Sequence, residues 1–387
     1  MLFKYGINNT FIDVTNIVLN KFKIDNLIIF PAGNKKFYIY FGDPVPNIVK
    51  NLIISVEDYN DIIIDEREIN EYVYNCDLNI LSVKNYNKID ELNSLLNPIT
   101  FSIPEEKITN IIPTKTKIIS SLIPGRTETY IYNTEEAYYD EYKKSLFAIT
   151  TRKSGWDCMR HYEILANGCI PYFPNIEQCP IYTMYLLPKE LIKEGNILYD
   201  KYKNKTIDEI PMTECNNLIT KLLQFTKDNL TTHKLAQYIL QKTNNMAVKK
   251  ILYLSGDINT DYLRCVTLHG FKILFGTNCH DYPKIPHLYK NCTIPNNSLY
   301  GKGMSYSKLL NDELHDDNLD VSVEQDIREK KYDIIIYGSY HRGMPYYDLV
   351  QQYYSPNHII LLCGEDLHWC DYQTYINKGH YVFVREL

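Results

Sequence analysis

Four short apolar runs in the last third of the chain constrain its fold more than any other feature. Residues 251–254 read ILYL, 334–337 read IIIY, 359–363 read IILLC and 381–384 read YVFV. An uninterrupted apolar run of this length is typical of a strand that is buried on both faces of a parallel sheet. We therefore expect an α/β lobe over residues 248–387, with a helix that ends at His269, a further strand at residues 271–275 and an irregular excursion at residues 291–329.

The loops that follow these runs are predicted to bind a ligand. In an open α/β sheet, ligands bind outside the carboxyl ends of the strands. Three such loops are polar and contain glycine, namely residues 255–257 (SGD), 338–343 (GSYHRG) and 364–368 (GEDLH). We expect the three loops to line one wall of a cleft.

The same alternation of strands and helices begins near residue 75. Apolar runs at residues 117–122, 145–150 and 169–173 alternate with helical patterns at residues 135–144 and 157–166, and residues 213–242 can form two more helices. This order is typical of βαβ units and a parallel sheet. We expect residues 75–247 to form a second Rossmann-like lobe. The fold class is therefore α/β, with two such lobes.

Residues 1–74 have a different pattern. Short β-type runs at residues 26–30, 36–41 and 49–56 are separated by the turn signals PAG and GDPVP. This segment is predicted to be a small all-β domain.

Composition and charge exclude several classes of function. The net charge is −6 without a long Lys/Arg stripe, which disfavours nucleic acid as a partner. No apolar run approaches the roughly 20 residues of a membrane span, and the first residues do not resemble a secretory signal. The ten cysteines are scattered without a CxxC pair, so we expect them to be reduced and the protein to be cytoplasmic.

The stretch TTRKSGWDCMRHYEILANGCIPYF at residues 150–173 carries the strongest site signal. Asp157 is predicted to cap a helix, whose free amides would face a ligand at the end of the preceding strand. Arg160 and Glu163 lie three residues apart on one face of that helix, where a guanidinium can grip a diphosphate and a carboxylate can bind a ribose diol. The alternative is that Arg160 and Glu163 form a surface ion pair and that Trp156 only packs in the core.

The run RHYEILANGCIP at residues 160–171 resembles the donor-site signature of exostosin-like glycosyltransferases of the GT-B fold. The resemblance implies that Arg160 binds the diphosphate of a UDP- or GDP-sugar, that Glu163 binds the ribose, and that the loop residues Arg152, Lys153 and Gly155 belong to the same site. The N-terminal segments YGINNTFIDVT and FGDPVPNIVKNLIISV resemble a small β module fused to glycosyltransferases in bacteria and giant DNA viruses. Ile, Asn, Lys and Tyr, which AT-rich codons encode, are frequent here, in agreement with a viral type and with the host cytosol as its location.

The position of this signature differs from the usual GT-B order. GT-B enzymes place the acceptor lobe first and the nucleotide-sugar lobe second, whereas here the signature precedes another α/β unit. Either the two lobes are permuted or the last unit has another role. The chain also ends in a predicted strand, which leaves open whether it is a fragment of a longer polypeptide.

The motifs favour transfer without a metal ion. GT-A enzymes hold Mn²⁺ or Mg²⁺ through an Asp-x-Asp loop, and the sequence contains none. Many retaining GT-B enzymes carry a second glutamate eight residues before the ribose glutamate, a position that Gly155 occupies. We therefore expect an inverting enzyme that needs no cofactor and transfers the sugar to a glycan or protein acceptor.

An inverting transfer requires a general base for the acceptor hydroxyl. The candidates lie at the strand ends of the last lobe: His341 first, then Asp257 and Glu365, with Asp366 and His368 also possible. Asp257 can equally be a helix cap, and the others can belong to solvated loops. A metal site formed by His341, Glu365, Asp366 and His368 is conceivable but has no known ligand spacing, so we predict no metal site.

Two other classes of function compete with the transferase. A carbohydrate- or nucleotide-binding assembly module could keep the lobes without chemistry. A nucleotide-dependent enzyme of another class is disfavoured, because the sequence contains neither a GxGxxG after a strand nor a GxxxxGK[ST] motif.

Overall fold

The computed structural model describes residues 2–7, 10–24, 27–30, 37–44, 50–55, 61–65, 71–76, 80–84, 93–366 and 370–387. The chain divides into two compact units, Met1–Glu91 and Leu92–Leu387. His368, one of the candidate bases, lies outside the described residues.

The N-terminal unit contains two four-stranded antiparallel sheets, whose strands are ordered β2-β1-β5-β6 and β3-β4-β7-β8. Its strands are β1 (Leu2–Ile7), β2 (Thr10–Asp13), β3 (Lys23–Ile24), β4 (Leu27–Phe30), β5 (Asn51–Ser55), β6 (Ile62–Asp65), β7 (Glu71–Asn75) and β8 (Ile80–Lys84). Phe3, Tyr5, Phe30 and Leu52 are among the residues of its own hydrophobic core. The strands predicted at residues 26–30 and 49–56 are confirmed by β4 and β5 over residues 27–30 and 51–55.

The unit is not all-β, because it also contains the helices α1 (Thr15–Lys21) and α2 (Phe37–Phe41). The predicted strand at residues 36–41 is wrong. Phe37 and Phe41 lie four residues apart and stack at 5.3 Å, and both are buried, so the run presents one apolar face at helical spacing. The unit extends beyond the predicted limit of residue 74, because β7 and β8 complete its second sheet.

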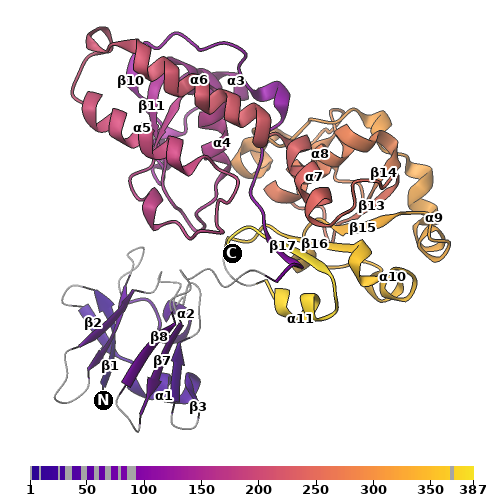
Figure 1. Cartoon of the computed structure of the whole chain (residues 1–387), viewed down its shortest axis with the longest axis horizontal. Coiled ribbons are helices and arrows are strands. Elements are labelled where there is room, and N and C mark those ends of the chain that lie inside the picture. The colour runs from indigo at the N-terminus through magenta and orange to yellow at the C-terminus, as the bar shows by residue number, and fades with distance from the viewer. Residues whose placement is uncertain are drawn as a thin grey trace. The chain divides into compact units, whose positions relative to one another are not determined.

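The second unit contains a three-stranded parallel sheet, which with its helices we call the middle lobe (Figure 1). Its strands are β10 (Lys117–Ile119), β11 (Ser145–Ile149) and β12 (Ile170–Tyr172), and its helices are α3 (Glu135–Lys144), α4 (Met159–Ala166), α5 (Lys189–Tyr202) and α6 (Met212–Asn229). The predicted alternation is confirmed here. Gly168, with φ +59°, follows the end of α4 in the left-handed conformation that was expected of it.

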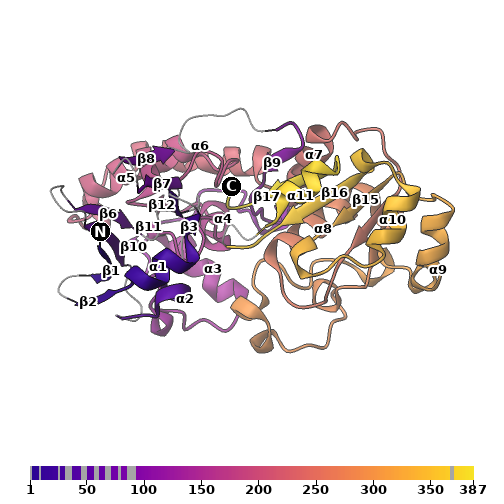
Figure 2. The same ribbon diagram turned by 90° about the horizontal axis from the view of Figure 1, so that it is seen from below.

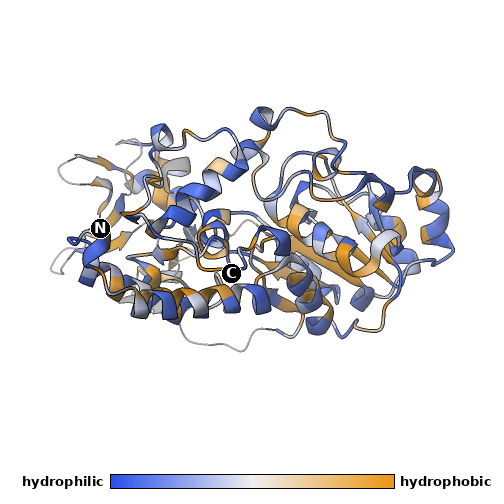
Figure 3. Cartoon of the chain, turned by 90° about the horizontal axis from the view of Figure 1, so that it is seen from above, coloured by the Kyte–Doolittle hydropathy of each residue, from blue (hydrophilic) through white to orange (hydrophobic). Residues whose placement is uncertain are grey.

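The last lobe is built on a six-stranded parallel sheet in the order β14-β13-β15-β16-β17-β9. Its strands are β13 (Ile251–Leu254), β14 (Cys279–Tyr282), β15 (Ile334–Tyr337), β16 (Ile359–Cys363), β17 (Tyr381–Val384) and β9 (Leu96–Pro98). The strand order reverses between β13 and β15, as in doubly wound folds, where this point opens a ligand crevice. In Figure 3 these strands are coloured hydrophobic and the outward faces of the helices around them hydrophilic.

The helices of this lobe are α7 (Thr232–Lys242), α8 (Tyr262–Phe275), α9 (Asp317–Arg328), α10 (Tyr347–Tyr353) and α11 (Tyr372–Asn377). The lobe takes β9 and α7 from the chain before the predicted boundary at residue 248. Val382 of β17 pairs with Leu96 of β9, and α7 packs along α8. Figure 2 shows β9 beside β17.

Two expectations for this lobe are corrected. Residues 271–275 belong to α8 and are not a strand, because Gly270 does not end the helix. A Cβ at Gly270 would lie 2.0 Å from the Thr232 carbonyl oxygen, so this glycine allows the close approach of α7. The polar segment at residues 291–329 is irregular only in its first part, since α9 forms its end.

The middle and last lobes share one hydrophobic core. A single cluster of buried residues contains Phe147 and Tyr162 of the middle lobe together with Leu268 and Ile360 of the last lobe. This shared core holds the carboxyl ends of both sheets at a common cleft. Among the described residues, no helix is both long and apolar enough to cross a membrane.

Candidate functional site

A cavity of about 780 Å³ lies between the middle and last lobes. Ligand sites in proteins commonly have volumes of about 300–1,000 Å³. The lining includes Lys153, Gly155, Arg160 and Glu163 from the middle lobe, and Asp261, Arg342, Glu365 and Asp366 from the last lobe. The structure therefore brings predicted residues of both lobes, among them Arg160, Glu163 and Glu365, to one site.

Arg160 reaches the cavity from the first turn of α4. Its Nε donates a hydrogen bond to Thr150 Oγ1 at 3.1 Å, and a terminal nitrogen donates to the Thr151 carbonyl at 3.1 Å. These bonds hold the guanidinium at the end of β11. No ion pair joins Arg160 to a carboxylate within the described part of the chain, so its charge is available to an anionic ligand. The alternative of an Arg160–Glu163 surface pair is excluded.

Glu163 lines the same cavity but is almost fully buried. Tyr138 donates a hydrogen bond to its Oε2 at 2.7 Å, and Ser305 donates to its Oε1. Burial raises the pKa of Glu163, although these two hydrogen bonds oppose the shift. Each oxygen has a second lone pair, so the carboxylate can still accept a hydrogen bond from a ligand hydroxyl.

Glu386 occupies two backbone amides of the loop just before α4. Its carboxylate accepts hydrogen bonds from the backbone N–H groups of Trp156 and Asp157, both at 2.9 Å. A Cβ at Gly155 would lie 2.6 Å from Glu386 Oε1, so only glycine permits this approach. An anionic ligand here must therefore be held by side chains, or by the amides of α4 itself.

Asp157 does not cap α4, contrary to expectation. The N-cap is Cys158, which makes no side-chain cap bond. The Asp157 carboxylate instead accepts hydrogen bonds from the Phe101 N–H at 2.7 Å and from the Tyr162 hydroxyl at 2.9 Å. Asp157 thus ties the start of α4 to the linker between β9 and the middle lobe. Trp156 is buried and stacks on Phe173, which confirms its packing role.

Arg385 joins the two walls of the cavity from its buried side. Its guanidinium is 0% exposed and pairs with Asp366 and Glu386. It also donates to the carbonyls of Asp157 and Gly364 and lies 4.4 Å from the ring centre of Phe101. Two carboxylates, those of Asp366 and Glu386, therefore pair with this one cation.

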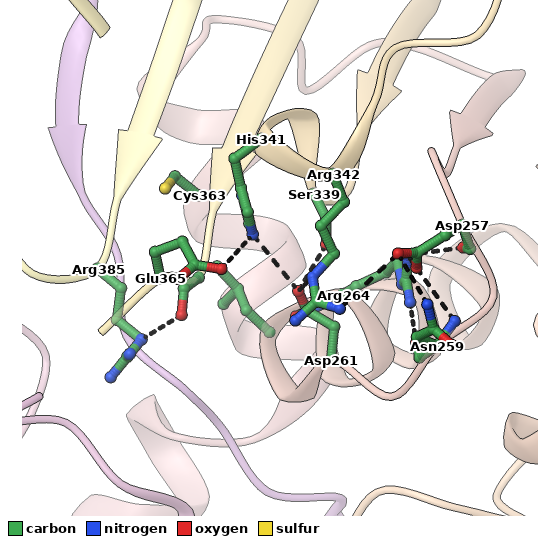
Figure 4. A network of polar contacts seen from close by, with 12 residues as sticks. Asp257, Asn259, Asp261, Arg264, Ser339, His341, Arg342, Cys363, Glu365 and Arg385 are labelled. Atoms are coloured by element: carbon green, nitrogen blue, oxygen red, sulfur yellow. Dashed lines mark hydrogen bonds and ion pairs between the residues drawn. The ribbon is translucent and has the colours of Figure 1, made fainter. Parts of the chain in front are cut away.

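Glu365 carries the last-lobe carboxylate that is best placed for chemistry (Figure 4). It follows β16, lines the cavity, and its Oε1 lies 2.9 Å from His341 Nε2. Contact with His341 lowers the pKa of Glu365, although burial opposes this. Glu365 is therefore ionised at neutral pH and can accept a proton.

His341, the first candidate for the base, does not line the cavity. Its side chain is 12% exposed, and both ring nitrogens are closed to solvent. Figure 4 shows its ring directed at Glu365 and Asp261. His341 can therefore act on a substrate only through Glu365.

Asp257 also does not line the cavity. Its carboxylate lies 3.0 Å from buried Arg264 and accepts a hydrogen bond from the Asn259 N–H at 3.1 Å. Burial alone would raise the pKa of Asp257, but the bonds from Arg264 and Asn259 lower it. Asp257 holds the loop after β13 in place. Asp261 beside it caps α8, and Ser339 and Arg342 contact its second oxygen.

The loops after β13 and β15 meet through two glycines. A Cβ at Gly256 would lie 2.4 Å from the Arg342 carbonyl oxygen, and Gly343 packs against Gly256 with φ +128°. This contact at the reversal of strand order positions Arg342, whose side chain is 30% exposed and lines the cavity.

A loop at residues 299–306 closes the site from a third side. Lys302 donates to the Tyr132 carbonyl at 2.6 Å, and the Ser305 N–H donates to Glu135 at 2.6 Å. This part of the predicted excursion therefore crosses from the last lobe to the middle lobe and supplies Lys302 to the cavity lining.

The remaining expectations concern the loop residues Arg152 and Lys153 and the redox state of the cysteines. Arg152 lies over the Trp156 ring at 5.4 Å and is not part of the cavity lining. Lys153 is exposed at the cavity. The expectation of reduced cysteines is wrong for Cys363 and Cys370, which form a disulfide that closes the loop carrying Glu365 and Asp366.

Sequence reasoning missed Arg385, Glu386, Asp261, Lys302 and Ser305. Arg385 and Glu386 directly follow β17, so the strand-end rule that selected the other loops applies to them as well. Lys302 and Ser305 lie in an irregular segment and had no comparable signal.

Comparisons with family models, with curated proteins and with solved structures found no match to this chain.

Proposed function

We propose that this chain is a glycosyltransferase that transfers a sugar from a nucleotide-sugar donor without a catalytic metal ion. One observation carries the proposal: a cavity at the carboxyl ends of two parallel sheets is lined by Arg160, which forms no ion pair with the described residues, by further cations, and by carboxylates with different partners, among them Glu163 and Glu365. The resemblance of residues 160–171 to an exostosin-like donor site supports it. In this proposal the lobes have a GT-B arrangement in permuted order, with the donor lobe first.

The middle lobe binds the donor in this proposal. Arg160 and Lys153 contact the diphosphate, and Glu163 accepts hydrogen bonds from the ribose hydroxyls. Arg342 and Lys302 face the same space from the other side, so cations surround the leaving diphosphate without a metal ion. A UDP- or GDP-sugar meets these requirements.

The last lobe supplies the base in this proposal. The Glu365 carboxylate takes the proton of an acceptor hydroxyl, and the hydroxyl oxygen attacks the anomeric carbon of the sugar. The bond from that carbon to the diphosphate oxygen breaks, and its electron pair leaves with the nucleoside diphosphate. His341 holds the Glu365 carboxylate in position. The acceptor is a glycan or protein hydroxyl.

Donor binding tests the site. UDP- and GDP-sugars are titrated into the wild type, Arg160→Ala and the control Arg328→Ala, which removes an exposed arginine of α9. Losing a charge-assisted contact should weaken binding roughly tenfold to hundredfold in Arg160→Ala only. Equal affinity in both variants would contradict the proposed donor site.

Donor hydrolysis and transfer to glycans in the presence of EDTA test the reaction. Turnover should persist, because no step uses a metal ion. Turnover that disappears and returns with Mn²⁺ or Mg²⁺ would contradict the mechanism. Donor binding without turnover on any acceptor would favour the alternative of a nucleotide- or carbohydrate-binding module.

A further inference from the structure

A second polar cluster lies in the last lobe, around the start of α9. His315 Nε2 lies 3.3 Å from Asp317 Oδ1 and 3.3 Å from Asp320 Oδ2. The three ligand atoms all lie within 4.8 Å of one another. The His315 side chain is 0% exposed, and its buried Nε2 has no hydrogen-bond partner among the described residues. A buried imidazole nitrogen is thus aimed between two carboxylates.

The other nitrogen of His315 is held by a buried carboxylate. His315 Nδ1 lies 3.0 Å from Asp281 Oδ1, and Asp281 is fully buried in β14. Lys272 and Tyr289 contact the same carboxylate at 2.7 and 2.9 Å. A histidine that binds a metal through one nitrogen usually donates its other N–H to a carboxylate in this way, which fixes the ring and directs the free lone pair at the ion.

Asp320 is oriented from behind by a second histidine. Its Oδ1 lies 2.8 Å from His280 Nε2, while His280 Nδ1 lies 2.7 Å from the Tyr332 hydroxyl. This leaves Oδ2 of Asp320 directed at His315. Lys272 balances the charge of Asp281, so Asp317 and Asp320 contribute two negative charges that match a divalent cation.

We propose that His315, Asp317 and Asp320 bind a Zn²⁺ ion, with water as the fourth ligand. In a tetrahedral zinc site, imidazole nitrogens and carboxylate oxygens lie about 2.0–2.2 Å from the ion. Two ligand atoms of such a site are therefore about 3.3–3.5 Å apart. The His315 distances agree with this spacing. Ca²⁺ and Mg²⁺ prefer oxygen ligands alone and fit the set less well.

The ion would have a structural role. None of its three ligands lines the cavity between the lobes, and no step of the proposed transfer uses it. It would fasten the start of α9 to β14, at the end of the segment whose Lys302 and Ser305 reach the middle lobe. Chelation should therefore lower the melting temperature of the protein without stopping turnover at a temperature where it remains folded.

Calorimetric titration and thermal shift with ZnCl₂ at pH 7.5 test the site on the full chain after removal of metals. The variant is Asp317→Asn, whose side chain is 88% exposed, so the fold is retained. The control is Asp316→Asn, because it removes the adjacent charge while asparagine can still cap α9 as Asp316 does. We expect wild type and Asp316→Asn to bind one Zn²⁺ with similar affinity, and Asp317→Asn to bind at least roughly tenfold more weakly.

Three results would overturn the proposal. Zn²⁺ binding equally strong in Asp317→Asn and the wild type would place the ion elsewhere, for example on free cysteines. Zn²⁺ binding weakened equally in Asp317→Asn and Asp316→Asn would show only a long-range effect of the lost charge. If ZnCl₂ did not raise the melting temperature of the wild type, no ion would bind here. A proton on His315, shared among three carboxylates, would then take the place of the ion.

Discussion

At the scale of single residues, Glu386 decides how the site can bind an anion. It takes the amides of Trp156 and Asp157, directly before the helix start whose amides were expected to bind phosphate. Burial raises the pKa of Glu386 to about 7, and Arg385 only partly offsets this because it also balances Asp157 and Asp366. A proton on Glu386 therefore belongs to the folded state near neutral pH.

Glu386→Gln should change the pH dependence of stability. Between the ordinary pKa of 4.5 and about 7, the folded chain keeps a proton that the unfolded chain has lost. The contribution of Glu386 to stability is therefore largest below pH 4.5 and falls, by about 3 kcal/mol at most, as the pH rises to 7. Urea unfolding of the wild type and of Glu386→Gln from pH 4.5 to 8 measures the difference between their free energies of unfolding. The other titrating groups are the same in both proteins and cancel in this difference. A constant difference would show that Glu386 is ionised in the folded state throughout.

Glu365 is the residue on which the proposed chemistry depends. Glu365→Gln keeps the shape of the side chain but removes the proton acceptor, so kcat of sugar transfer should fall by about 10² to 10⁴ while donor affinity stays the same. Asp257→Asn is the matched control, because Asp257 lies outside the cavity lining and braces a loop. Full activity of Glu365→Gln would exclude Glu365 as the base.

At the scale of elements, the α7–α8 contact explains a boundary that the sequence pattern misplaced. Glycine before an apolar run usually indicates the end of a helix, which made residues 271–275 look like a strand. Gly270 instead lets the backbone of α8 touch the Thr232 carbonyl of α7, and α8 ends only before Gly276, whose φ is +56°.

Gly270→Ala should destabilise the protein by about 1–3 kcal/mol, because the added methyl group meets backbone that cannot rotate away. Thermal unfolding measures this effect. Ile273→Ala on the same helix is the control, since Ile273 is 55% exposed and a surface change should stay within about 0.5 kcal/mol. Equal melting temperatures for Gly270→Ala and the wild type would mean that α7 and α8 can move apart without a loss of stability.

At the scale of the whole molecule, the two compact units have separate hydrophobic cores. Among the described residues, the buried core of the first unit runs from Phe3 to Tyr74, whereas one cluster from Ile99 to Phe383 spans the middle and last lobes. Cooperative unfolding follows a shared core, so the two lobes should unfold together.

A chain of residues 92–387 should fold without the N-terminal unit. Calorimetry should show one transition for this fragment, and its affinity for a nucleotide sugar should stay within about twofold of that of the full chain, because every residue of the cavity lining lies after Leu92. Two separate transitions in the fragment would show that the middle and last lobes do not unfold as one unit.

The sequence alone determined the features that depend on neighbouring residues. Period and turn signals located β13, β15, β16 and β17, the helix α3 and the left-handed Gly168. The strand-end rule selected Glu365, which lines the cavity with Arg160 and Glu163, but it also selected His341 and Asp257, which do not line it. The strand and helix predictions succeeded because strand burial and helix ends follow from local pattern.

Only the tertiary structure decided which of these groups remain available to a ligand. Glu386 lies 230 residues from Trp156 in the chain and takes its amide, and Ser305 lies 142 residues from Glu163 and takes one of its oxygens. The same long-range packing moved β9 into the last sheet and turned His341 away from the cavity. A hydrogen bond or buried contact between distant residues leaves no periodic signal, because it depends on how whole elements pack.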